Sequence, residues 1–108
     1  MERTMKRVID GRVYNTETAT EICELPCRHN PGDFGYHQTS LYLTKNGRYF
    51  LAGGGGPMSM WARALDGNST GGGSGVRPLD KSEARDYAES ADLDDEELRS
   101  AGFEIEEA

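Results

Sequence analysis

Short apolar segments, each ended by a turn sequence, make up the first half of the chain. One pair of segments, residues 7–9 and 12–14, flanks Asp10-Gly11. Asp-Gly between β-branched and aromatic residues is typical of a two-residue type I′ turn, because both turn residues need positive φ angles. We therefore expect a β-hairpin near the N-terminus.

A second hairpin is predicted from residues 41–45 and 48–52, which flank Asn46-Gly47. A two-residue turn at that point sets which residues of the two strands face each other. The opposed pairs are then Leu43 with Phe50, Tyr42 with Leu51, and Leu41 with Ala52. Both faces of such a hairpin are apolar, so we expect it to be central, with a helix over one face and a loop over the other.

Residues 17–25 have the pattern of a short α-helix. Thr18 and Glu21 have the spacing of a capping box, and Pro26 ends the pattern. The apolar side of this helix would consist of Ala19, Ile22 and Cys23.

Two acidic helices are predicted in the last third of the chain. Asp80 with Glu83, and Asp94 with Glu97, have the spacing of capping boxes. The buried stripe of the first helix would be Ala84, Tyr87, Ala88 and Ala91. Gly102 is the expected end of the second helix.

Two glycine-rich stretches separate these elements, residues 53–56 and residues 66–75. Neither is followed by the lysine of a phosphate-binding loop, and Met58 and Val76 occupy the third glycine position of a dinucleotide motif. We interpret them as mobile connectors or as places where backbones approach closely, and residues 66–75 as a flexible loop.

The predicted fold class is therefore α+β. A small antiparallel sheet of two hairpins would pack with the short N-terminal helix and with the acidic C-terminal helices. The 108 residues suit a single domain, with residues 1–5 frayed and residues 92–108 forming an acidic helix and tail. Without an apolar segment long enough for a membrane span or a secretory signal, we expect a cytoplasmic protein.

Charge divides the chain into two parts. Residues 1–79 contain nine Lys and Arg against seven Asp and Glu, whereas residues 80–108 contain three against twelve. The C-terminal part therefore carries a net charge of −9 within a total of −7. This excess argues against phosphate binding by that part, and it favours either a solvated face or attraction to a basic surface.

Candidate catalytic and metal-binding residues are few. Cys23, Cys27, His29 and His37 offer four zinc ligands, but their spacing crosses Pro26 and differs from compact zinc sites. The alternative is a small buried hydrophobe at Cys23 and a loop for the others. No nucleophile, base and acid are singled out, so we expect neither an enzyme nor a bound metal or cofactor.

Tyr42, Tyr49, Trp61 and Arg63 are residue types that dominate protein interfaces. In a chain with few aromatic residues, most must also fill the core. We therefore name all four as candidate partner-binding residues and expect at least two of them to be core residues.

Several segments together resemble a family of small, mostly uncharacterised bacterial proteins that are frequent in phages, prophages and other mobile elements. The matching segments are residues 9–19, 41–42, 47–51, 54–57, 62–63, 78–79 and 83–89. Small acidic α+β proteins from such elements often resemble anti-CRISPR proteins, which commonly occupy a nucleic-acid-binding surface of a Cas effector without catalysis.

This resemblance implies a protein-binding inhibitor that imitates a line of phosphates. The carboxylates expected to do so are Glu83, Asp86, Glu89, Asp95, Glu96 and Glu97. The alternative hypothesis is a small regulator that binds DNA or RNA through its N-terminal part. The cations for that role are Arg3, Lys6, Arg7, Arg12, Arg28, Lys45 and Arg48.

Overall fold

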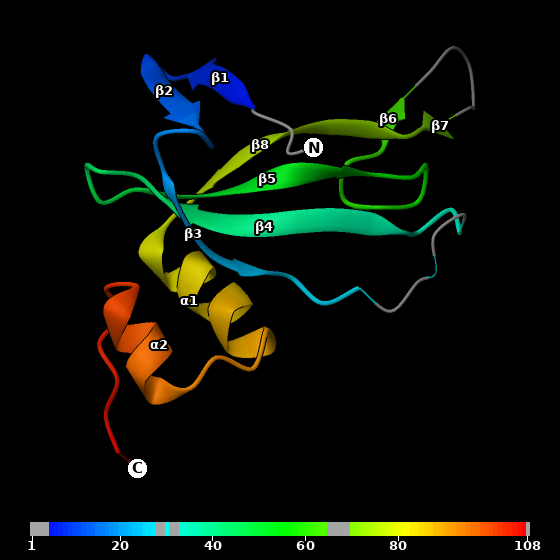
Figure 1. Ribbon diagram of the computed structural model, residues 1–108. Coiled ribbons are helices and arrows are strands. Elements are labelled where there is room, and N and C mark those ends of the chain that lie inside the picture. The colour runs from blue at the N-terminus through cyan, green and yellow to red at the C-terminus, as the bar shows by residue number, and fades with distance from the viewer. Residues whose placement is uncertain (1–4, 28–29, 31–32, 65–69, 108) are drawn as a thin grey trace.

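The computed structural model describes residues 5–27, 30, 33–64 and 70–107 (Figure 1). Within these residues the strands are Lys6–Ile9 (β1), Arg12–Asn15 (β2), Thr20–Glu24 (β3), His37–Leu43 (β4), Tyr49–Gly55 (β5), Arg63–Ala64 (β6), Thr70–Gly71 (β7) and Gly73–Leu79 (β8). The helices are Lys81–Ser90 (α1) and Asp95–Ser100 (α2). The α+β prediction is confirmed.

The central element is a four-stranded antiparallel sheet in the order β3-β4-β5-β8. The β1–β2 hairpin lies on one side of this sheet, and α1 and α2 lie on the other (Figure 1). Two apolar clusters result. Leu41 and Leu51 pack with α1 and α2, whereas Phe50 and Ala52 pack with Tyr14 of β2.

The N-terminal hairpin forms as predicted. Val8 pairs with Val13, and Ile9 pairs with Arg12. Asp10 and Gly11 have φ angles of 52° and 75°, as a type I′ turn requires. The Met5 amide donates to Thr16 Oγ1 at 2.9 Å, and the Met5 carbonyl accepts from the Thr16 amide at 2.9 Å, so Met5 extends the hairpin. The other residues predicted to fray, 1–4, lie outside the described part.

The predicted register of the β4–β5 hairpin is wrong by one residue. Leu43 pairs with Tyr49, and Leu41 pairs with Leu51. The connection has three residues rather than two, because the Thr44 amide donates to the Arg48 carbonyl at 2.8 Å and Gly47 takes a φ of 83°. A type I turn followed by a left-handed glycine is the usual three-residue solution.

This register exchanges the faces of the residues on β5. A shift of one residue moves every side chain of a strand to the opposite face. Tyr49 and Leu51 therefore join Leu41 beneath the helices, and Phe50 joins Tyr42 beneath the β1–β2 hairpin. Stacking between the rings of Tyr42 and Phe50, 5.1 Å apart, follows from this arrangement.

The predicted helix over residues 17–25 is wrong, because most of this segment is strand β3. The amides of Thr18 and Ala19 instead form a turn on the Asn15 carbonyl, at 3.3 and 3.1 Å. An isolated helix of this length is marginal, whereas pairing with β4 satisfies the backbone of β3 and suits β-branched residues such as Ile22.

The glycine-rich stretches form the far end of the sheet. Gly53 pairs with Gly75, and Gly55 pairs with Gly73. A flexible loop over residues 66–75 is therefore wrong for β7 and for the start of β8, while residues 66–69 lie outside the described part. Close backbone approach is confirmed, because a Cβ at Gly53 would lie 2.8 Å from the Thr39 Cα.

Trp61 fills the space that the glycines leave on the helical side of the sheet. Its ring would lie 3.6 Å from a Cβ at Gly75. Its Nε1 donates to Thr39 Oγ1 at 2.8 Å, and Thr39 is only 1% exposed. The indole therefore gains a polar partner where it is buried, and it lies within van der Waals distance of position 75.

Both C-terminal helices begin with the predicted capping boxes. Asp80 accepts from the Glu83 amide at 2.8 Å, and Asp94 accepts from the Glu97 amide at 2.8 Å. The hydroxyl of Tyr49 donates to the Ala101 carbonyl at 2.6 Å and thereby links β5 to the end of α2. Phe103 stacks on the same ring with centroids 5.0 Å apart.

Replacing Tyr49 by phenylalanine should lower the free energy of unfolding by about 1–3 kcal/mol, because the buried Ala101 carbonyl loses its partner. Urea denaturation measures this loss. The matched control is Tyr87→Phe in α1, since no hydrogen bond involves the Tyr87 hydroxyl in the described part of the chain. Equal losses in the two variants would contradict the role given to the Tyr49 hydroxyl.

Stability should also depend on pH through Tyr49. Burial raises the pKa of its hydroxyl above the ordinary value. The stabilisation is complete below the unfolded pKa of about 10 and is lost as pH rises through the higher folded pKa. Urea denaturation from about pH 9 to about pH 11 should therefore show a smaller decline for Tyr49→Phe than for the unaltered chain. Parallel declines would refute this.

Candidate functional site

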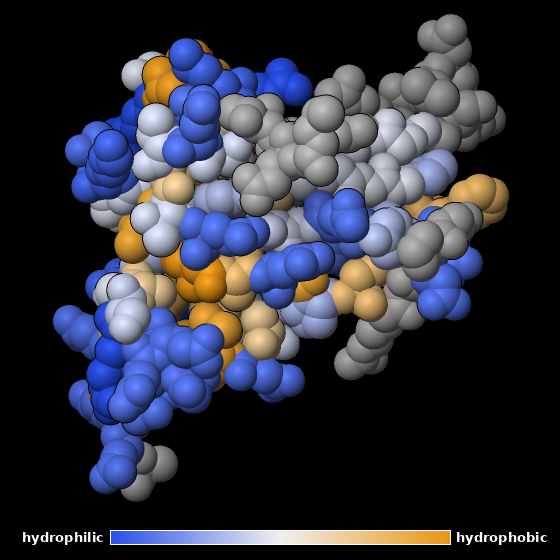
Figure 2. Space-filling model, viewed as in Figure 1, coloured by the Kyte–Doolittle hydropathy of each residue, from blue (hydrophilic) through white to orange (hydrophobic). Residues whose placement is uncertain are grey.

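The exposed side of α1 and α2 carries an acidic surface. We define it by the six carboxylates predicted from the sequence: Glu83, Asp86, Glu89, Asp95, Glu96 and Glu97, all exposed. Ala84, Ala88 and Leu98 face the sheet from the same helices and are buried. Hydrophilic side chains cover this region in the space-filling view (Figure 2).

Three of these carboxylates have structural partners. Glu83 Oε1 accepts from the Asp80 amide at 3.1 Å, and Glu97 Oε1 accepts from the Asp94 amide at 3.3 Å. Asp95 forms an exposed ion pair with Arg99 at 3.0 Å. These contacts reduce what the three groups can offer to another molecule.

Asp86, Glu89 and Glu96 make no side-chain hydrogen bond or ion pair with the described residues. Asp86 and Glu89 lie three residues apart on α1, so they share one side of that helix. Glu96 adds a third carboxylate from α2. These three are the strongest candidates for contacting a basic partner.

The four predicted interface residues other than the acids have different positions. Tyr49 is 5% exposed and Trp61 is 9% exposed, which confirms that at least two of the four are core residues. Neither can reach a partner from the core. Tyr42 is half-buried beside Phe50, and Arg63 lies in β6 with its side chain outside the described set.

Tyr87 is an aromatic residue beside the acidic surface that the sequence assigned only to the buried stripe. It is half-buried and packs against the apolar cluster beneath α1. An aromatic ring with one covered and one exposed edge is a common interface anchor. The sequence signal for a place beside the acidic surface was its position between Glu83 and Glu89 in the helix.

A groove of about 600 Å³ lies over the glycine end of the sheet, on the side away from α1. Gly54 and Ala52 contribute to its floor, and Tyr36, Gln38 and Ser40 line it. Its lining contains one carboxylate, Glu24. The groove is a polar recess in which Glu24 and Ser40 are partners in the β3–β4 register.

The cysteine and histidine residues do not converge in the part of the chain that the structure describes. His37 Nδ1 lies 3.0 Å from Thr39 Oγ1, and His29 lies outside the described residues. No group of three or more His, Cys, Asp or Glu that could hold a metal forms among residues 5–27, 30, 33–64 and 70–107. Burial, together with the carboxylates of Glu21 and Glu97, raises the pKa of the half-buried Cys23 thiol.

Comparison of the chain with protein-family models, curated proteins and solved structures finds no match. The resemblance to a phage or mobile-element family therefore stays a prediction. Within the described residues, no helix is long and apolar enough to cross a membrane.

Removing the charges of Asp86, Glu89 and Glu96 should leave the fold intact. The variant Asp86→Asn, Glu89→Gln, Glu96→Gln should unfold in urea within about 0.5 kcal/mol of the unaltered chain, because these side chains are exposed and unpartnered. The capping variant Asp80→Ala should lose about 0.5–2 kcal/mol. A comparable loss in the triple variant would show that its carboxylates serve the helices instead.

Proposed function

We propose that this protein is a non-enzymatic inhibitor that binds a basic, nucleic-acid-binding surface of another protein through its acidic surface. The observation that carries the proposal is the outward direction of Asp86, Glu89 and Glu96 on helices whose other sides are buried. The sheet holds these helices in place, so the carboxylates are presented on a fixed scaffold.

The physical basis is charge complementarity. A rigid array of carboxylates can take the place of phosphates on a surface rich in Lys and Arg, and opposite charge accelerates the encounter. Exposed ion pairs contribute little affinity individually, so the half-buried ring of Tyr87 would supply apolar contact beside them. Binding of this kind weakens as salt concentration rises.

A CRISPR–Cas effector is the partner class that we favour. This choice rests on the resemblance to proteins of mobile elements and on the acidic C-terminal part of the chain. Such effectors hold nucleic acid in positively charged channels. An acidic protein bound in that channel would exclude the nucleic acid without any chemical reaction.

The test is capture of an effector by the tagged protein from a nuclease-treated bacterial lysate that carries CRISPR effector complexes, with identification by mass spectrometry. We expect stoichiometric capture of one effector and loss of its target-DNA binding. The variant Asp86→Asn, Glu89→Gln, Glu96→Gln should weaken capture by about tenfold or more at about 150 mM salt.

A matched control removes three acids from another part of the surface. The variant Glu17→Gln, Glu21→Gln, Glu24→Gln changes the net charge equally, and all three side chains are exposed. It should retain capture within about twofold if the position of the charges matters more than their number. Equal losses in the two triple variants, or no captured effector, would overturn the proposal.

A further inference from the structure

A second groove, of about 470 Å³, lies between the tip of the β1–β2 hairpin and the β4–β5 turn. Arg12 and Tyr14 line it from the hairpin, and Thr44, Asn46 and Arg48 line it from the turn. Both connections are closed by glycines with positive φ, Gly11 at 75° and Gly47 at 83°. Two tight turns from distant parts of the chain therefore place two arginines around one recess.

The electrostatics of this recess are opposite to those of the whole chain. Arg12 and Arg48 are exposed, and neither forms an ion pair with any residue that the structure describes. The segments that build the groove, residues 6–17 and 44–48, also carry three further exposed cations: Lys6, Arg7 and Lys45. Their acids are Asp10 and Glu17, so these segments have a net charge of +3.

We propose that this groove binds a phosphate group of a nucleic-acid backbone. Two guanidinium groups suit a phosphate because each can donate two parallel hydrogen bonds to its oxygens. The Asn46 side chain adds an amide donor. The Thr44 Oγ1 accepts from the Arg48 amide at 3.0 Å, which leaves the hydroxyl proton able to donate.

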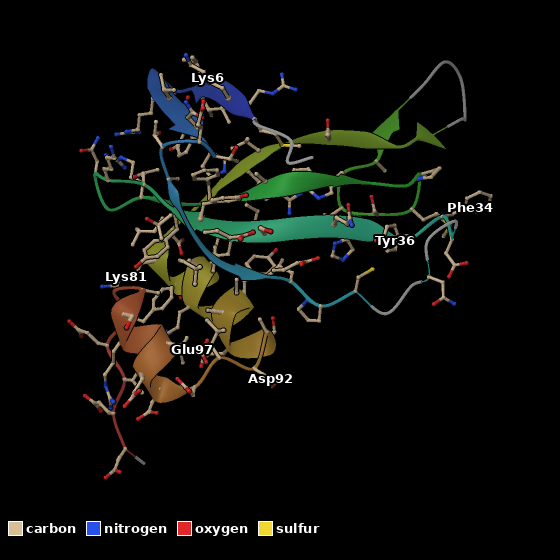
Figure 3. The ribbon with its side chains drawn as sticks, in the orientation of Figure 1. Lys6, Phe34, Tyr36, Lys81, Asp92 and Glu97 are labelled. Carbon is tan, nitrogen blue, oxygen red and sulfur yellow. The ribbon has the colours of Figure 1, made fainter. Side chains whose placement is uncertain are left out.

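A polymer backbone is favoured over a single small anion by the cations outside the groove. Lys6 lies on the outward side of the β1–β2 hairpin (Figure 3), and Lys45 lies beside Asn46 in the turn. Contacts spread over several phosphates position a nucleic acid without reading its bases. Tyr14, the aromatic residue of the groove, is 5% exposed and stacks edge-on against Phe50, so it offers no face to a base.

The acidic surface and the hairpin part of the groove lie on different sides of the sheet. The β1–β2 hairpin and the acidic helices lie on opposite sides of the sheet (Figure 1), in a molecule 48 Å long in its longest direction. Charges farther apart than the screening length of about 8 Å at physiological salt interact weakly through solvent. The hairpin side of the groove is thus separate from the acidic surface, whereas Arg48 is next to Tyr49, whose partner Leu79 precedes Asp80 at the start of α1. The two proposals are tested by different variants, so either can fail without the other.

The test is fluorescence anisotropy of a labelled single-stranded DNA of about 20 nucleotides, titrated with the full chain at several salt concentrations. We expect binding that weakens with salt. The variant Arg12→Gln, Arg48→Gln should weaken it by about tenfold or more and reduce the slope of log affinity against log salt by about 1. The matched control, Arg85→Gln on α1 with Arg99→Gln on α2, removes the same charge and should bind within about twofold of the unaltered chain.

The proposal is overturned if the unaltered chain does not bind at low salt, if the two double variants weaken binding equally, or if the Arg12 and Arg48 variant binds unchanged. Competition with ATP separates a polymer from a free nucleotide. If ATP displaces the DNA at an equal phosphate concentration, the groove binds a free nucleotide, and its assignment to a nucleic-acid backbone is overturned. Because Arg12 and Arg48 are exposed, circular dichroism of their variant should be unchanged and confirm that loss of binding is not loss of fold.

Discussion

Strand β5 is covered on both of its faces, and its register against β4 decides the composition of both apolar clusters. The left-handed glycine at position 47 and the Thr44–Arg48 hydrogen bond fix that register. Because of it, Tyr49 points beneath the helices, where its hydroxyl holds the carbonyl of Ala101. The neighbouring Phe50 points to the opposite side and contacts Tyr14. The helices and the N-terminal hairpin are thus anchored by adjacent residues of one strand.

The C-terminal half of β5 consists of glycines, and the sheet depends on their lack of side chains. A Cβ at Gly53 would clash with the backbone of Gln38 and Thr39, and a Cβ at Gly55 would clash with the Ser59 side chain. Glycine therefore lets β4, β5 and β8 continue as a sheet here. Glycine within a strand weakens it by roughly 0.5–1 kcal/mol, because the unfolded chain loses more freedom. Burial of the Trp61 indole and its bond to Thr39 offset part of that loss.

Local patterns predicted those parts of the fold that depend on local geometry. The Asp10-Gly11 turn and the two capping boxes need only residues within three positions of each other, and all three formed as expected. The helix predicted around Ile22 is wrong because this segment pairs with the edge of β4, and no local pattern reveals that pairing. The β4–β5 register predicted from Asn46-Gly47 is wrong because this dipeptide suits hairpin connections of two residues and of three.

The candidate sites follow the same division between local and distant information. The exposure of Asp86 and Glu89 could be predicted from helical periodicity, whereas the burial of Tyr49 and Trp61 depends on distant partners. The groove beside Arg12 and Arg48 could not be predicted, because two turns more than thirty residues apart form it. The sequence shows these arginines, but it does not show that they line one groove.

The charges of the molecule are distributed unevenly, with cations on the β1–β2 hairpin and carboxylates on the helices across the sheet. Its net charge of −7 describes the behaviour at a distance, where it moves as an anion. Closer to a surface, within about a screening length, the nearer set of charges dominates the force and turns the molecule. At low salt a positively charged surface should therefore face α1 and α2, and a negatively charged surface should face the β1–β2 hairpin.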